Sequence, residues 1–150
     1  MKRSINILFI VILLTQACKS NKDLQTKEND NLKLIKASYN NWISGIKGGG
    51  KGTEFYLTVL STVNDIKIDS ISIGSERFKT ISKPINDEKY YDIGEIKYNK
   101  GDTIHIRASG GNDYRINEID NNNYLEYYIK NDKKTLIIKK FIKIKSVNQQ

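Results

Sequence analysis

From residue 34 onward, the chain alternates short apolar runs with clusters of glycine, asparagine and aspartate. The run 53–63, TEFYLTVLSTV, places Phe55, Leu57 and Val59 on one face of an extended strand and the intervening side chains on the other. No stretch keeps a 3.6-residue period for three turns, so no amphipathic helix is expected. The hydrophobic pattern therefore predicts an all-β fold.

The strand signals amount to seven or eight strands at fairly even spacing. In chain order they are 34–43, 53–63, 66–73, one that begins near Arg77, 90–98, 103–108, 124–130 and 134–145. The isoleucines at 66 and 68 are out of phase with those at 71 and 73, which predicts a bulge at Asp69–Ser70. Lys140 interrupts the apolar face of the last strand, which predicts a second bulge. Short strands with a single proline, Pro84 in a polar link, are typical of one antiparallel, immunoglobulin-like β-sandwich.

Three turn signals connect these strands. Gly74–Glu76 is a turn sequence, Asn99–Asp102 predicts a hairpin between the strands on either side of it, and Asn131–Asp132 predicts a hairpin between the last two. In the strand 103–108, the two isoleucines and Ala108 are expected to face the core. His105 and its neighbour at 107 are expected to face outward.

Residues 1–17 have the features of a lipoprotein signal peptide. Two basic residues precede an apolar stretch, 7–14, which is far shorter than the ~20 residues that span a bilayer. Ala17–Cys18 ends this stretch as the lipobox of bacterial lipoproteins does. Cys18 is the only cysteine in the chain, and an exported protein cannot use a lone thiol for an internal disulfide. The sequence therefore predicts a mature protein held at a membrane by lipidated Cys18.

The polar segment 18–32 is expected to be a disordered tether, and 33–147 a single domain. The formal net charge is +8, but 21 lysines against four arginines are not the composition that phosphate and base recognition favours. A nucleic-acid partner is therefore not expected. Lysines near the C-terminus suit either contact with anionic lipid or protection of an edge strand.

The segment 45–53, GIKGGGKGT, comes close to the phosphate-binding pattern G-x-x-x-x-G-K-[ST]. Gly52 stands where the pattern requires a hydroxyl, and the residues that follow alternate as a strand rather than opening a helix. The glycines are therefore predicted to form a turn between two strands, and no nucleotide is expected.

Four features follow one another along the chain: Cys18, a short polar tether, the segment 42–52 with the signature W-x-x-G-x-x-G-G-x-x-G, and a Lys-Gly-Asp turn at 100–102. In these features the chain resembles a group of small Gram-negative cell-envelope lipoproteins of unknown function. The resemblance implies one immunoglobulin-like β-sandwich domain and an outer-membrane lipoprotein. It supplies no catalytic residue. Trp42 is similar to the buried tryptophan of β-sandwich cores and is expected in the core, with stacking against a ligand as the alternative.

Few residues offer catalytic or metal chemistry. His105 is the only histidine, and a zinc site needs three or four ligands, so neither a catalytic triad nor a metal is expected. Carboxylates in the loop 109–123 could serve a small glycan-processing hydrolase or bind calcium; they are Asp113, Glu118 and Asp120. The calcium-loop spacing is absent, and such residues are also ordinary in solvated loops.

Tyrosines are the better binding candidates. The adjacent pairs Tyr90–Tyr91 and Tyr127–Tyr128 should each send one ring to either face of a strand. The outward rings can serve as platforms for a sugar or a partner protein. The candidate binding residues are Tyr91, Tyr114 and Tyr128.

These observations predict a non-catalytic binding or accessory protein of the bacterial cell envelope, without a cofactor. Its partner would be an envelope protein or a glycan. A glycan-binding module, a small hydrolase and an inhibitor or immunity-type lipoprotein are the alternatives.

The lipid anchor is open to a direct test. Replacement of Cys18 by serine is expected to abolish incorporation of a palmitate analogue, because serine lacks the thiol that receives the diacylglyceryl group. Labelling of whole cells, followed by a blot for the protein, measures this. Equal label in the wild type and the variant would contradict the anchor.

Overall fold

The computed structural model describes residues 30–45, 50–111 and 122–145, which form eight strands and no helix. The all-β prediction is confirmed. No helix in the described part of the chain has the length and apolar character needed to cross a membrane. The strands are β1 (Leu32–Ile43), β2 (Lys51–Ser61), β3 (Ile66–Ile73), β4 (Glu76–Pro84), β5 (Thr103–Ser109), β6 (Asn123–Ile129), β7 (Asp132–Ile137) and β8 (Ile142–Lys143).

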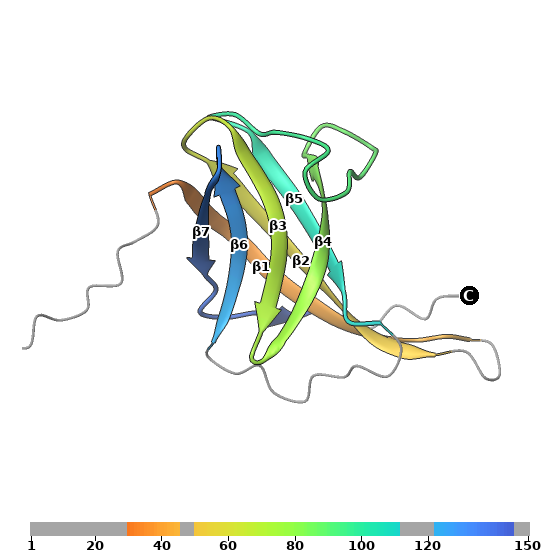
Figure 1. The fold of residues 1–150 in the computed structure, drawn as a ribbon. Coiled ribbons are helices and arrows are strands. Elements are labelled where there is room, and N and C mark those ends of the chain that lie inside the picture. Colours follow the sequence, from red (N-terminus) through yellow and green to blue (C-terminus); the bar gives the residue numbers. More distant parts are fainter. Residues whose placement is uncertain (1–29, 46–49, 112–121, 146–150) are drawn as a thin grey trace, which may run out of the picture.

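All eight strands belong to one hydrogen-bonded sheet, in the order β7-β6-β3-β4-β5-β2-β1-β8. The sheet is strongly curled, so that β7, β6, β3 and β4 lie in front of β5, β2 and β1 in Figure 1. Every neighbouring pair is antiparallel except β1 and β8, which run parallel. The sheet is therefore mixed, and the expectation of purely antiparallel strands is wrong at this one pair.

β4 joins the two halves of the curled sheet. Its first part pairs with β3, from Ser70↔Lys79 to Ile73↔Glu76, and its second part pairs with β5, from Thr80↔Ala108 to Pro84↔Ile104. Apart from β1–β8 and β3–β4, the neighbour pairs are those found within the two sheets of an immunoglobulin domain. Because β4 connects them without a break, the two-sheet sandwich stays a prediction. Pro84, expected in a polar link, is the last residue of β4.

The core lies inside the curl and is lined from both halves. The ring centroid of Phe55 on β2 is 5.5 Å from that of Phe78 on β4 and 5.8 Å from that of Phe141. The predicted inward faces of β2 and β5 are confirmed, since their alternating apolar residues are buried. The register of β3 against β6 shifts between Ile68 and Ser70, which confirms the first predicted bulge.

The predicted last strand, 134–145, is two short elements instead of one bulged strand. β7 ends at Ile137, and Ile138 and Phe141 are buried as the chain crosses to the opposite end of the sheet. There β8 pairs with Ser38 and Tyr39 of β1. Residues 138–141 can span at most about 17 Å, so the two ends of the sheet must lie that close. The burial of two side chains during the crossing is the physical reason for the break.

The strand predicted at 90–98 is wrong. Only two isolated bridges occur there, Ser82↔Tyr91 and Ile66↔Tyr98. β5 instead pairs with β2 and β4. The turn at 99–102 does form, but it docks on the end of β2, where Ser61 accepts a hydrogen bond from the Gly101 amide and donates one to the Asp102 carbonyl. The segment 90–98 is therefore held by the burial of Tyr98, which is only 1% exposed, and not by a hairpin ladder with β5.

β1 and β2, on either side of the glycine segment, pair antiparallel up to Ile43↔Lys51, so the chain reverses direction between them as predicted. Residues 46–49, which include part of the predicted glycine turn, lie outside the described residues. Trp42, however, is half-buried and does not belong to the core. Its ring lies over Gly52, its partner across the β1–β2 ladder. The first strand also begins earlier than predicted, since Leu32, the last residue of the expected tether, is buried in β1.

The contact between Trp42 and Gly52 predicts that Gly52→Ala destabilises the domain by about 1 to 3 kcal/mol, because overpacking forces neighbours apart. A Cβ at Gly52 would lie 2.3 Å from the Gly111 carbonyl oxygen and 2.9 Å from two ring carbons of Trp42. Urea unfolding followed by circular dichroism measures the change. Ser75→Ala in the exposed β3–β4 turn is the control, and an unfolding midpoint of Gly52→Ala equal to the wild type would contradict the contact.

Tyr98 predicts a loss of stability at alkaline pH. Burial raises the pKa of Tyr98 from 10.0 to about 12. The unfolded chain releases the Tyr98 proton near pH 10 and the folded chain near pH 12. The contribution of the protonated hydroxyl to the free energy of unfolding is therefore complete below pH 10 and is lost as the pH rises to 12. Tyr98→Phe, which also loses the 2.8 Å hydrogen bond to Ser82 Oγ, should be less stable than wild type at pH 8. The gap should narrow between pH 10 and 12, and a constant gap would show that Tyr98 does not titrate differently on folding.

Candidate functional site

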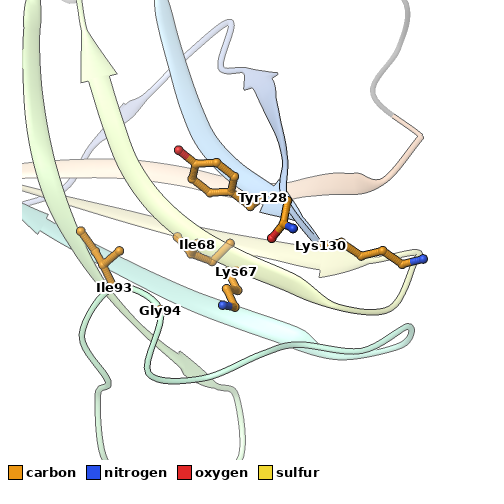
Figure 2. Close-up of a pocket in the computed structure, with 7 residues that line it drawn as sticks. Lys67, Ile68, Ile93, Gly94, Tyr128 and Lys130 are labelled. Carbon is orange, nitrogen blue, oxygen red and sulfur yellow. The ribbon is translucent and has the colours of Figure 1, made fainter.

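A pocket of about 290 Å³ opens where the start of β3 meets the β6–β7 turn and the segment after β4 (Figure 2). The walls are mostly apolar, and lysine, tyrosine and asparagine side chains also line it. Its lining residues are Lys67, Ile68, Ile93, Gly94, Tyr128, Lys130 and Asn131.

The pocket exists because β4 leaves β3 halfway. On that side of β3, Tyr98 exchanges two backbone hydrogen bonds with Ile66, of 2.8 and 2.9 Å, and the ladder to β4 begins only at Ser70. No described strand pairs with residues 67–69 on that side. Amides two residues apart in a strand point the same way, so the N–H and C=O of Ile68 point away from β6 and toward the side where Ile93 and Gly94 lie.

Tyr128 forms one wall of the pocket. It pairs across the ladder with Lys67, while its neighbour Tyr127 is buried in the core. This confirms the predicted division of the 127–128 pair between the two faces of the sheet. Neither Lys67 nor Lys130 makes an ion pair with a described residue. The two charged residues that line the pocket, Lys67 and Lys130, are both basic. Asp65, at the end of the pocket, pairs with Lys97 at 3.6 Å.

Backbone strain is concentrated at one end of this pocket. Asp65 and Lys130 have φ of 61° and 57°, and they are the two non-glycine residues with positive φ in the described segments. The Lys130 amide donates to the Asp65 carbonyl at 3.2 Å. Side chains other than glycine adopt this conformation at a cost, and such residues are frequent at functional sites. The sequence therefore places a lysine at the rim where glycine or asparagine would be easier to accommodate.

Further along β6, a charged network fixes the outer face of the sheet. The Glu126 carboxylate accepts hydrogen bonds from Ser70 Oγ, Arg77 and Lys133, at 2.6 to 2.8 Å. Arg77 also binds Asp69 at 2.6 Å. Burial opposes ionisation of Glu126, but the hydrogen bonds and the charge of Arg77 outweigh it and lower its pKa. A carboxylate held by three donors is a poor general base, so this network is structural.

A second polar cluster lies on the outer face of β1, β2 and β5. Tyr56 and Arg107 both donate to the buried carboxylate of Glu54. Burial, followed by the hydrogen bond to Glu54, raises the pKa of Tyr56 to about 12. Asn40 Oδ1 and Trp42 Nε1 are buried on the same face, without a hydrogen-bond partner in the described part of the chain. The strand pattern contains no signal for this cluster, because its members are spread over three strands.

The predicted site residues have different outcomes. Tyr128 lines the pocket, whereas Tyr91 lies elsewhere, donates to Asp87 at 3.0 Å and has Lys89 5.1 Å from its ring centroid. Because 90–98 is not a strand, the pair Tyr90–Tyr91 is not divided across a sheet. Cys18, Tyr114 and the loop carboxylates Asp113, Glu118 and Asp120 lie outside the described residues.

No group of three or more His, Cys, Asp or Glu that could hold a metal ion occurs in segments 30–45, 50–111 and 122–145. His105 is half-buried on β5, opposite Thr58 and Lys83, and faces outward as predicted. Neither of these neighbours forms a nucleophile–base pair with it that could support acyl transfer.

Sequence reasoning missed most of the pocket. Ile93 and Gly94 belong to a segment expected to be a strand, and Lys67 and Lys130 were indistinguishable from other surface lysines. The adjacent tyrosines at 127–128 were the one signal that led to it. Comparison of the chain with protein-family models, with curated proteins and with solved structures gives no match.

Proposed function

We propose that the protein is a lipid-anchored component of the bacterial cell envelope that binds a partner without catalysis, through the pocket beside Tyr128. The anchor rests on the signal sequence and Cys18, and the assignment to the outer membrane rests on the resemblance to small Gram-negative cell-envelope lipoproteins. The binding role rests on the pocket.

The observation that carries the proposal is the coincidence of three unusual features at one place. Within the described residues, the pocket adjoins a stretch of strand edge without a strand partner, two lysines without an ion-pair partner, and both non-glycine residues with positive φ. A purely structural surface has no need to combine them. Natural sheets commonly cover or charge an open edge, and here the edge leads into an apolar pocket instead.

A non-catalytic role fits the carboxylates. Glu54 and Glu126, the buried carboxylates of the described residues, are each held by cationic or hydroxyl donors. Such groups stabilise the folded structure, and donors that favour the ionised form make them poor general bases. The hydrolase alternative depends on loop carboxylates outside the described residues, and no observation favours it.

Site-specific photocrosslinking in cells tests the binding role. Ile93, exposed at 40%, is replaced by p-benzoylphenylalanine in the full-length protein. Irradiation is expected to give a discrete adduct on a blot, because a bound partner lies against this wall of the pocket. The same photoreactive residue at position 75, in the exposed β3–β4 turn, is the control. No adduct at 93, or the same adducts at both positions, would contradict binding at the pocket.

A further inference from the structure

We propose that the partner is an extended acidic peptide segment that adds beside β3 at Ile68 and places one apolar side chain in the pocket. This inference rests on the proposed function and names the chemical class of its partner. It is derived from the size of the pocket, the orientation of the Ile68 amide and the charge at the rim.

The size of the pocket favours part of a larger molecule. Pockets that enclose whole small molecules usually measure about 300–1,000 Å³ and cover most of the ligand. This one, at about 290 Å³, lies at the lower limit and contains Ile93, itself 40% exposed. Its volume suits a side chain such as valine or leucine that projects from a chain lying across the surface. The apolar walls suit this side chain better than a sugar, which needs many hydrogen bonds.

The backbone of β3 supplies the second contact. The N–H and C=O of Ile68 point toward the unpaired side of the strand, between the Tyr98 bridge and the first pair with β4. A guest residue in extended conformation can bond to both, as in recognition by strand addition. On the C-terminal side the Asp69 carbonyl already accepts from Thr80 Oγ1 at 2.7 Å, which limits pairing to one guest residue. The contact is therefore short, and the neighbouring side chains must provide specificity.

The rim supplies charge. Lys67 on β3 and Lys130 in the β6–β7 turn have no described ion-pair partner, and Asp65 is paired with Lys97. Glu126 is the next carboxylate along β6, and it is bound by Arg77 and Lys133. An acidic residue next to the inserted apolar side chain can therefore pair with either amino group, since no described carboxylate forms an ion pair with Lys67 or Lys130.

The φ of 57° at Lys130 fits this role. Glycine has no steric penalty in that conformation, so a turn chosen for stability alone would use it. The strained lysine places an amino group at the rim, and its replacement by glycine separates stability from binding. A structural role predicts that Lys130→Gly is neutral or stabilising in every assay. A binding role predicts equal or higher thermal stability together with weaker binding.

The test uses the full-length protein in detergent and three fluorescent heptapeptides. The first alternates glutamate and valine, the second replaces glutamate by lysine, and the third carries an N-methyl group on the central valine of the acidic peptide. Fluorescence anisotropy should show saturable binding of the acidic peptide. Binding should weaken at least about tenfold for the lysine peptide, because of charge, and for the N-methyl peptide, because one backbone bond is lost.

Protein variants complete the test. Lys67→Ala and Lys130→Gly should each weaken binding of the acidic peptide several-fold with an unchanged or higher melting temperature. Lys36→Ala, an exposed lysine on β1, is the matched control and should bind as the wild type does. Equal binding of all three peptides, or unchanged binding by both pocket variants, would overturn the inference.

The failure of this inference can be distinguished from that of the proposed function. A photoadduct at position 93 together with no peptide binding would leave the binding role intact and overturn the peptide. A protease-resistant adduct that stains as glycan would also leave the binding role intact and overturn the peptide, and it would identify a sugar as the partner. Absence of both the adduct and peptide binding would overturn both proposals.

Discussion

The division of β4 between two neighbours is the constraint on which the rest of the structure depends. A strand can form only one ladder on each side, and β4 gives its first residues to β3 and its last to β5. The two halves of the curled sheet meet at β4, and Phe78 of β4 packs against Phe55 of β2 in the core. Because the β3–β4 ladder begins only at Ser70, the first half of β3 has no strand partner among the described residues on that side. Tyr98 pairs there with Ile66 alone. The pocket follows from this remaining gap.

Two buried carboxylates, Glu126 and Glu54, connect neighbouring strands on the outer faces of the curled sheet. Glu126 connects β3, β4, β6 and β7 through Ser70, Arg77 and Lys133, and Glu54 connects β2 with β5 through Arg107. A buried charge without partners is costly, so each carboxylate fixes the positions of its donors. The network at Glu126 and the Tyr128 ring lie on the same face of β6. The wall of the pocket thus belongs to a rigid part of the sheet.

Much of the fold could be predicted from the sequence, because alternation reports directly on which face of a strand is buried. The faces of β2 and β5, the bulge in β3 and the division of Tyr127 and Tyr128 all follow from it. The segment 90–98 could not be predicted, since its apolar residues contact β3 and β4 singly rather than in a ladder. The pocket escaped prediction for the same reason, because contacts between distant segments leave no local period. The prediction of a core position for Trp42 was wrong because its ring packs over Gly52, its partner on the neighbouring strand, instead of entering the core.

The pairing of β1 has a mechanical consequence. β1 is joined to β2 from Leu32↔Ser61 to Ile43↔Lys51, and at Ser38 and Tyr39 it is also joined to β8. If the chain is held in a membrane through its N-terminus, tension enters at Leu32 and acts along the strand. The hydrogen bonds, which lie across the pulling direction, are then loaded together in shear instead of opening one after another. Under the proposed function, a pull on a partner beside β3 would pass through β4, β5 and β2 before it reached β1. The sheet would then be one continuous tensile connection between the proposed anchor and the proposed partner.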